Sequence, residues 1–203
     1  MLKNIVFDLG GVLADWDPKY LYYKVLNDDK NFAEFLLESV VTQEWNAGQD
    51  EGRSIAEAVE TLSAEYPQYA QWIALYYDRW EEMLKGSIEG TVEILEQLHQ
   101  KKTHRLLALT NWSHETFPVA QRRFSWLTLF EGIVVSGVEK CMKPQDKIFQ
   151  ILLERHQINA QESLFIDDNL DNIHAAAGLG FKVIHFKNPS QLKTEMQNLG
   201  IDL

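Results

Sequence analysis

Carboxylates follow two apolar runs of the 203-residue sequence, and these residues are the best placed to do chemistry. Asp8 comes directly after the run I-V-F and is followed by Gly10 and Gly11, whereas Asp167 and Asp168 follow the run L-F-I. Short apolar runs of this kind predict buried strands. Two adjacent carboxylates repel each other, so the acidic pair favours a bound cation over a solvated loop. Asp8 by itself is equally typical of an ordinary loop that follows a strand.

Other polar residues stand at the ends of further predicted strands. Thr110 and Asn111 follow the run L-L-A-L, and Lys143 comes shortly after the run I-V-V. The carboxyl ends of parallel strands lie along one edge of a sheet, so these side chains are expected to converge with the carboxylates. The alternatives are helix capping for Thr110 and Asn111, and a solvated surface position for Lys143.

The elements that position these residues alternate between strand and helix, which predicts an α/β fold with a doubly wound, Rossmann-like parallel sheet. The predicted strands are 5–7, 105–109, 133–135, 164–166 and 182–185, and the predicted helices of the second half are 146–156, 170–179 and 190–199. Residues 19–84 instead show helical periodicity, with Ser54 and Glu57 forming a capping box. We therefore expect a core of residues 1–14 and 88–203, interrupted by an α-helical cap of residues 15–87.

Composition limits the function further. The formal net charge is -11, which argues against a nucleic-acid partner, because phosphate backbones attract Lys and Arg. The single cysteine, Cys141, excludes an intramolecular disulfide. No apolar run approaches the roughly 18 residues of a membrane span, and the first residues do not form a signal peptide. A soluble, cytoplasmic protein without a membrane partner is the expectation.

Four motifs in order carry a family resemblance: F-D-L-G-G-V-L, L-L-A-L-T-N, M-K-P and F-I-D-D-N-L-D-N-I-H-A-A. Together they resemble the haloacid dehalogenase superfamily of hydrolases, which has an inserted helical cap. The D-L-G start and the D-D-N-x-D-N-I run are similar to a subset of sugar-phosphate phosphatases. The resemblance covers the core at both ends of the chain, whereas the cap matches only in position and helical character.

The resemblance implies that Asp8 is a nucleophile that forms an aspartyl-phosphate. It also implies an Mg²⁺ ion held by a carboxylate oxygen of Asp8, the backbone carbonyl of Gly10 and Asp168. Asp167 would share the metal or lie behind its ligands. Mg²⁺ would relieve the repulsion between the attacking carboxylate and the phosphate.

Further roles are implied for the remaining motif residues. Thr110 would donate a hydrogen bond to a phosphoryl oxygen, and Lys143 would place a cation against the phosphate and Asp8. Asn111 would contact the substrate, and the backbone N–H groups of Leu9 to Gly11, including Gly10, would cradle the phosphate.

The sequence departs from the family pattern at Gly10, where most of its phosphatases carry the aspartate that protonates the leaving group and activates water. Asp15, or a water held by the substrate, is the hypothesised replacement. Substrate choice would depend on the cap, where a loop over residues 45–53 is the part expected to reach the site. Arg53 in that loop would meet an anion or form a surface salt bridge.

Three functions are compatible with these observations. The first is an Mg²⁺-dependent phosphatase of a small phosphorylated metabolite, such as a sugar phosphate. The second is a metal-independent 2-haloacid dehalogenase, which Asp167 and Asp168 disfavour because extra anions hinder expulsion of halide. The third is a non-enzymatic protein that binds a phosphorylated ligand and has lost turnover at Gly10.

Overall fold

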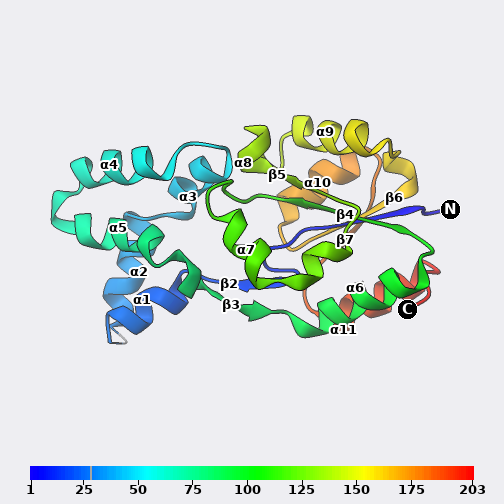
Figure 1. The fold of residues 1–203 in the computed structure, drawn as a ribbon, viewed down its shortest axis with the longest axis horizontal. Helices are drawn as coiled ribbons and strands as arrows, with labels where there is room; N and C mark the ends of the chain where they lie inside the picture. The colour runs from blue at the N-terminus through cyan, green and yellow to red at the C-terminus, as the bar shows by residue number, and fades with distance from the viewer. Residues whose placement is uncertain (28) are drawn as a thin grey trace.

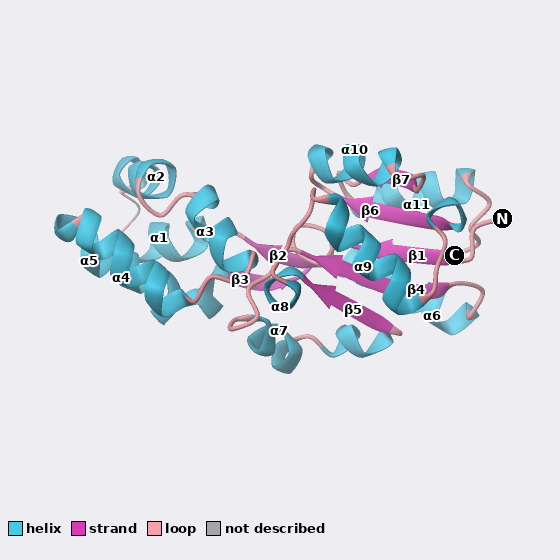
Figure 2. Cartoon of the chain, turned by 90° about the horizontal axis from the view of Figure 1, so that it is seen from above, coloured by secondary structure: helices cyan, strands magenta, loops and turns pink. Residues whose placement is uncertain are grey.

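The computed structural model describes residues 1–27 and 29–203 and contains a parallel five-stranded sheet in the order β5-β4-β1-β6-β7 (Figures 1 and 2). The strands are β1 (Asn4–Phe7), β4 (Arg105–Thr110), β5 (Gly132–Val135), β6 (Ser163–Asp167) and β7 (Lys182–His185). All five predicted strands are confirmed. β1 lies between β4 and β6, so the three strands that carry the main candidate residues are neighbours.

Helices cover both faces of the sheet (Figure 1). One face carries α9 (Asp146–His156) and α10 (Leu170–Gly178), and the other carries α6 (Glu89–Lys101) and α11 (Pro189–Asn198). Side chains of a strand alternate between faces, and Val6 accordingly packs in the cluster of Phe149, whereas Ile5 and Phe7 pack in the cluster of Leu192. Burial on both faces explains why the strands read as continuous apolar runs.

The chain leaves the sheet region after β1 and returns before α6, and in between it forms a helical insert, residues 19–83. The insert contains α1 (Lys19–Val25), α2 (Lys30–Ser39), α3 (Gln43–Asp50), α4 (Ile55–Glu65), α5 (Ala70–Asp78) and the 3₁₀ turns η1 (Pro67–Tyr69) and η2 (Trp80–Met83). This confirms the helical prediction. The hydroxyl of Ser54 accepts from the Glu57 N–H at 3.2 Å, which is half of the predicted capping box.

Two short strands that the sequence analysis did not predict join the insert to the sheet region. β2 (Ala14–Trp16) pairs antiparallel with β3 (Leu84–Ser87), bringing Ala14 opposite Ser87. Three- and four-residue strands leave no periodicity long enough to detect. Their pairing lies at the predicted border between core and cap, and the division into two domains stays a prediction.

The remaining short elements lie in the connections between the strands of the sheet. They are α7 (Phe117–Arg123), η3 (Ser125–Leu129), α8 (Ser136–Glu139) and η4 (Ala160–Glu162).

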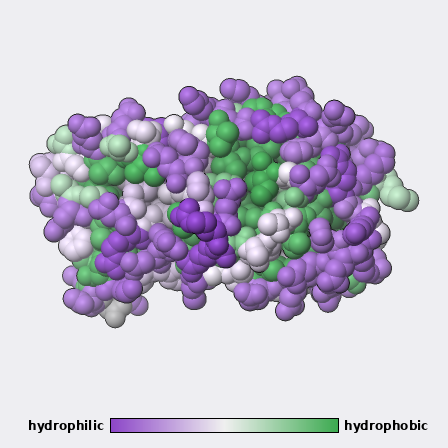
Figure 3. All heavy atoms as spheres, in the orientation of Figure 1, coloured by the Kyte–Doolittle hydropathy of each residue, from purple (hydrophilic) through white to green (hydrophobic). Residues whose placement is uncertain are grey.

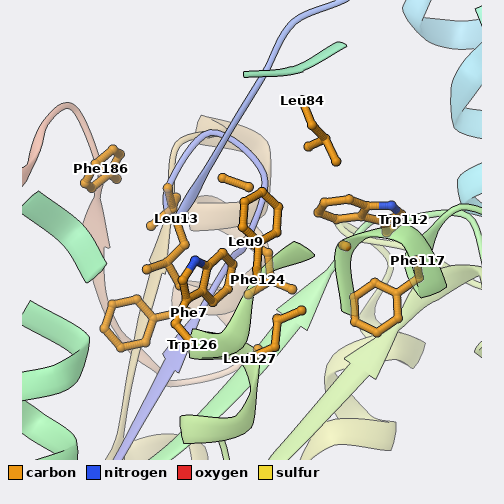
Figure 4. Packing of buried hydrophobic residues seen from close by; sticks show 14 of the residues in the cluster. Phe7, Leu9, Leu13, Leu84, Trp112, Phe117, Phe124, Trp126, Leu127 and Phe186 are labelled. Carbon is orange, nitrogen blue, oxygen red and sulfur yellow. The ribbon is translucent and has the colours of Figure 1, made fainter. Parts of the chain in front are cut away.

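One apolar cluster continues from the sheet into the insert. It includes Phe7 of β1 and Trp112 after β4, together with Tyr22 and Tyr76 of the insert. Figure 4 shows part of this cluster, with labelled side chains from β1, β3 and α7. In Figure 3 hydrophilic residues cover most of the visible surface, and hydrophobic residues gather toward its middle. Among the described residues, no helix is long and apolar enough to cross a lipid bilayer.

The carboxyl ends of the sheet strands point toward the helical insert, and both chain termini lie at the opposite end of the sheet (Figure 2). Polar residues that follow β1, β4 and β6 are therefore brought together between the sheet and the insert, as the order of the strands requires.

Candidate active site

Asp8 stands one residue beyond β1, at the centre of this edge. Its Oδ1 accepts a hydrogen bond from the Leu9 N–H at 2.7 Å and forms an ion pair with Lys143 Nζ at 2.9 Å. Burial raises the pKa of Asp8 to about 7, since the carboxylates of Asp167 and Asp168 add to the effect and the Lys143 ammonium offsets only part of it. A bound cation would oppose this rise and keep Asp8 in the nucleophilic carboxylate form.

Lys143 is 1% exposed and lies between two carboxylates, with Nζ 2.9 Å from Asp8 Oδ1 and 2.7 Å from Asp167 Oδ2. Burial works against the ammonium form, but the negative charges of Asp167 and Asp8 outweigh it and hold the pKa of Lys143 above its usual value. The prediction that Lys143 contacts Asp8 is thus confirmed by the geometry, and a solvated surface position is wrong.

Asn111 clamps the backbone of Lys143. Its Oδ1 accepts from the Lys143 N–H, and its Nδ2 donates to the Lys143 carbonyl, both at 2.9 Å. The amide of Asn111 therefore holds the lysine in place. Direct substrate contact by this side chain, which lines the same cleft, stays a prediction.

Asp167 is fully buried, and protein donors already engage both of its oxygens. Oδ2 accepts from Lys143 Nζ, Oδ1 accepts from the Asn169 N–H at 2.8 Å, and the Asn172 amide donates to both oxygens at 3.1 Å. This arrangement favours a position behind the metal ligands over direct coordination. It also gives Asn172 a role, which is to orient Asp167.

Asp168 is exposed to the cleft and packs against Gly11. A Cβ on Gly11 would lie 2.3 Å from Asp168 Oδ2, and Gly11 has a φ of +72°, which favours glycine. Burial and the neighbouring Asp167 raise the pKa of Asp168, although Lys143 lowers it in part. The absence of a side chain at Gly11 thus permits the close approach of this turn to Asp168.

The residues present fit a divalent cation. Asp8, Asp167 and Asp168 each offer a carboxylate oxygen, and these oxygens lie within 4.8 Å of one another. Carboxylate oxygens are the ligands that Mg²⁺ takes in proteins, with water filling the remaining positions. Three carboxylates around a single buried ammonium leave net negative charge that a divalent cation would balance.

The predicted phosphate cradle is mostly occupied by internal hydrogen bonds. The Leu9 N–H donates to Asp8 Oδ1, and the Gly11 N–H donates to the Ala14 carbonyl at 2.9 Å. A cradle made of all three N–H groups is therefore wrong for this conformation, because the tight turn after β1 consumes two of them. Within residues 1–27 and 29–203, the Gly10 N–H is the one of the three that donates to no backbone or side-chain acceptor.

Thr110 ends β4 and is 1% exposed. Its Oγ1 has no hydrogen-bond partner among the described residues. A buried hydroxyl without a partner costs about 1–3 kcal/mol, so an acceptor from outside the chain would stabilise it. Thr110 does not line the cleft, and its hydrogen bond to a phosphoryl oxygen stays a prediction.

Two connected hollows lie over these residues. The acidic cleft has a volume of about 430 Å³ and is lined by Asp8, Gly10, Lys143 and Asp168, together with residues of α3. The aromatic cavity beside it has a volume of about 70 Å³. It is lined by Gly10, Trp16, Asn46, Asp50, Tyr77, Trp80, Asn111, Trp112, Ser113 and Thr116.

The insert reaches the site through α3, as predicted for residues 45–53, but as a helix and not as a loop. Asn46, Ala47 and Asp50 of this helix line the acidic cleft. Arg53 does not contact the cleft; its guanidinium donates to Gln49 Oε1 and to the Trp45 carbonyl. The anion-binding role considered for Arg53 is therefore not supported.

Asp15 lies outside the site. Its carboxylate accepts from the Tyr20 hydroxyl at 2.8 Å and lies 3.8 Å from Lys85 Nζ. Its strand neighbour Trp16 lines both hollows, whereas Asp15 lines neither of them. The placement of Asp15 therefore gives no support to the hypothesis that it replaces the missing acid.

The sequence analysis missed Asp50, Asn46 and Trp16. Asn46 and Asp50 are four residues apart and share a helix face, and the Asn46 amide donates to Asp50 Oδ2 at 2.9 Å. That spacing was the available signal, but many surface helices carry the same pattern. Trp16 sits in a strand too short to show which way it points.

Comparison with known proteins finds one family model that covers most of the chain. Residues 5–186 match a family model described as haloacid dehalogenase-like hydrolase. The chain is 24% identical over 198 residues to a sesquiterpene phosphatase of Aspergillus oryzae, covering 97% of this chain and 96% of that protein. It is also 25% identical over 204 residues to a drimenol cyclase of Aspergillus calidoustus. That match covers 98% of this chain but only 37% of the drimenol cyclase.

Solved structures share the fold. A haloacid dehalogenase-like hydrolase of Porphyromonas gingivalis matches all of both chains with a TM-score of 0.74 at 22% identity. A haloacid dehalogenase family enzyme of Bacteroides thetaiotaomicron, in complex with magnesium and inorganic phosphate, matches 93% of this chain and 96% of its own with a TM-score of 0.69 at 23% identity.

Proposed function

The chain belongs to the haloacid dehalogenase-like hydrolases, and we propose that within this family it is an Mg²⁺-dependent phosphatase of a small phosphorylated metabolite, acting through an aspartyl-phosphate on Asp8. The observation that carries the proposal is the pairing of Asp8 Oδ1 with Lys143 beside the carboxylates of Asp167 and Asp168. This arrangement provides a nucleophile, a fixed cation and a metal site at one sheet edge.

Each side chain has a definable task in this reaction. A carboxylate oxygen of Asp8 attacks phosphorus, and Lys143 holds the other oxygen and attracts the phosphoryl group toward the nucleophile. Asn111 and Asp167 keep Lys143 in position through its backbone and its ammonium. Asp8, Asp168 and the carbonyl of Gly10 would hold Mg²⁺, which when bound neutralises phosphoryl oxygens and so reduces the repulsion between two anions.

The size of the aromatic cavity supports a small leaving group. Its volume of about 70 Å³ is roughly half of the 150 Å³ cavity that accommodates benzene, so it holds only a few non-hydrogen atoms. Its lining mixes aromatic faces with polar groups, and the indole N–H groups of Trp16 and Trp112 are buried without partners in the part of the chain described. A short, hydroxyl-bearing alcohol such as part of a sugar phosphate fits this chemistry.

The comparisons support a phosphatase, although they leave the substrate open. The sesquiterpene phosphatase is similar along nearly its whole length. A glyceraldehyde 3-phosphate phosphatase of Pyrococcus abyssi is 37% identical over 59 residues, 29% of this chain. The second of these acts on a small phosphate ester, in accord with the volume of the aromatic cavity.

The test is phosphate release from a panel of phosphorylated sugars, nucleotides and small acids, with Mg²⁺ and with EDTA. We expect metal-dependent release that Asp8→Asn abolishes and Asp15→Asn, the same change outside the cleft, leaves intact. Halide release from 2-chloropropionate in EDTA would instead indicate a dehalogenase. Binding of inorganic phosphate without turnover of any ester would indicate a non-enzymatic binding protein.

A further inference from the structure

We propose that Asp50, the last residue of α3, is the general acid and base of the hydrolysis and takes the role for which Gly10 provides no carboxylate. The inference rests on the proposed phosphatase function and deepens it. It assigns a catalytic residue to the helical insert. The four sequence motifs all lie outside the insert, and no residue pattern within the insert predicts such a residue.

The first argument is position. Asp50 lines both the acidic cleft, with Asp8, and the adjoining aromatic cavity. Gly10 also lines both hollows, and a Cβ added to Gly10 would have no atom within 4 Å. A carboxylate at position 10 would therefore project into the same space that Asp50 borders. The leaving oxygen must lie between the phosphoryl group in the cleft and the alcohol in the cavity, which is where the two hollows meet.

The second argument is a chain of hydrogen bonds that ends on Asp50. Arg53 donates to Gln49 Oε1, Gln49 Nε2 donates to the Tyr77 hydroxyl at 2.9 Å, and that hydroxyl donates to Asn46 Oδ1 at 2.9 Å. The Asn46 amide then donates to Asp50 Oδ2 at 2.9 Å. Such a network fixes one carboxyl oxygen and polarises its members in one direction. The carboxyl group is held at its position instead of moving freely with solvent.

The third argument is proton affinity. Burial raises the pKa of Asp50 to about 7, while the Ser113 N–H beside the carboxylate lowers it in part. Tyr76 and Tyr77 of α5 interact electrostatically with its carboxylate, and Arg53, three residues after Asp50, is linked to it only through the hydrogen-bond chain. A group that is half protonated near neutral pH can both donate and accept a proton during turnover.

The proposed reaction balances in two steps. As a bond forms from Asp8 to phosphorus, the bond from phosphorus to the leaving oxygen breaks, and the proton of Asp50 moves to that oxygen. The alcohol departs and leaves Asp50 ionised. A water molecule then attacks phosphorus while Asp50 takes its proton, the bond from phosphorus to Asp8 breaks, and inorganic phosphate leaves with both aspartates restored.

The experiment compares two small phosphates that differ in leaving-group acidity, acetyl phosphate and ethyl phosphate, under rapid-quench conditions with Mg²⁺. Acetate leaves without a proton, whereas the ethyl alkoxide needs one. For Asp50→Asn we expect phospho-enzyme to form from acetyl phosphate within about tenfold of the wild-type rate and from ethyl phosphate at least about 100-fold more slowly. The phospho-enzyme should also persist, because water is no longer activated.

Asp15→Asn is the matched control and should show none of these changes, and urea unfolding confirms that each variant is folded. Adding Gly10→Asp to Asp50→Asn should restore much of the ethyl phosphate rate. An equal loss with both phosphates, or no loss with either, overturns the role of Asp50 and leaves the phosphatase proposal standing. A wild-type protein that forms no phospho-enzyme from either phosphate overturns the proposed function and the role of Asp50 with it.

Discussion

Gly11 and Asp168 are packed so closely that no side chain fits between them: a Cβ on Gly11 would lie 2.3 Å from Asp168 Oδ2 and 2.8 Å from its Cγ. The turn after β1 and the loop after β6 therefore fix each other, although 157 positions separate them along the chain. Asp168 is the carboxylate of the site that is most accessible to a metal, because protein donors engage Asp8 and Asp167. Any widening of the turn displaces Asp168.

Gly11→Ala should weaken Mg²⁺ binding by about 10–100-fold, because the added methyl group pushes Asp168 out of position. The positive φ adds a cost of about 1–2 kcal/mol to folding. Titration calorimetry with Mg²⁺ measures the first effect and urea unfolding the second. Gly10→Ala, whose Cβ meets open space, is the matched control for stability. Equal Mg²⁺ affinity in Gly11→Ala and the wild type would contradict the importance of this contact.

Lys143→Met should destabilise the protein by about 3–5 kcal/mol in EDTA, because it leaves the buried carboxylates of Asp8 and Asp167 without their cation. Mg²⁺ should then stabilise the variant more than it stabilises the wild type, since the site has become more negative. Urea unfolding with and without Mg²⁺ gives both values. Lys24→Met, which breaks an exposed ion pair with Glu82, should cost less than about 1 kcal/mol. The same Mg²⁺ effect in Lys143→Met and wild type would argue against a metal beside Lys143.

The Asn111→Ala variant distinguishes two roles of the Asn111 side chain, which are positioning Lys143 and binding the substrate. If the amide serves to hold the Lys143 backbone, its loss should lower kcat and kcat/KM together and leave KM nearly unchanged. The lost hydrogen bonds should also cost about 1–2 kcal/mol of stability. Steady-state kinetics with the best substrate of the panel decides the matter. A raised KM with unchanged kcat would show that Asn111 binds substrate, as the sequence analysis predicted.

Asp50→Asn should make the protein more stable at pH 8 than the wild type. The folded-state pKa of Asp50, about 7, lies above its ordinary value of 3.8, so folding favours the protonated form. The resulting stability is fully present below the ordinary value and is lost as pH rises through 7. A gap of roughly three pKa units corresponds to up to about 4 kcal/mol.

Thermal unfolding of the two proteins from pH 4 to pH 9 measures this difference. The gap in stability should be small at pH 4, grow with pH and level off above pH 8. Asp15→Asn provides the control, because Asp15 lies outside the cleft. A difference that does not change with pH would mean that folding does not raise the pKa of Asp50.

Sequence patterns were sufficient for the sheet and for the residues at its carboxyl edge. Asp8 and Asp167 follow neighbouring parallel strands, so the order of the strands brings them together, whereas Lys143 reaches them from the loop after α8, where Asn111 holds its backbone. The same reasoning failed for Asp15 and Asp50. Proximity in sequence favoured Asp15, but its carboxylate contacts Tyr20 and Lys85 and does not line the cleft. Asp50 reaches the site only because the insert folds back over the sheet, and a contact between distant segments leaves no local pattern to detect.

For a related reason, the sequence analysis overestimated how many backbone N–H groups of the turn after β1 are free to bind phosphate. A glycine turn offers several N–H groups, and the sequence does not show which of them the turn itself uses. In the structure the Gly11 N–H closes the turn on the Ala14 carbonyl, and the Leu9 N–H bonds to the Asp8 side chain. Hydrogen bonds inside a tight turn depend on its backbone angles, which residue types alone do not determine.

Trp80→Leu should shift substrate preference toward longer phosphate esters. Trp80 lines the aromatic cavity, and its ring lies 5.7 Å from that of Trp112, so the two indoles limit the space for the leaving group. Replacing one of them with a smaller apolar side chain opens the cavity while keeping it dry. Pocket changes of this kind are worth about 1–3 kcal/mol, or roughly 10–200-fold in kcat/KM.

The measurement is kcat/KM for a series of alkyl phosphates of increasing length, from ethyl to octyl phosphate. The ratio of long to short substrates should rise at least about tenfold in Trp80→Leu. Trp126→Leu is the matched control, because Trp126 is equally buried but donates to Ser87 and does not line the cavity. If both variants shift the ratio alike, the change reflects general loosening of the core, and the leaving group does not occupy the aromatic cavity.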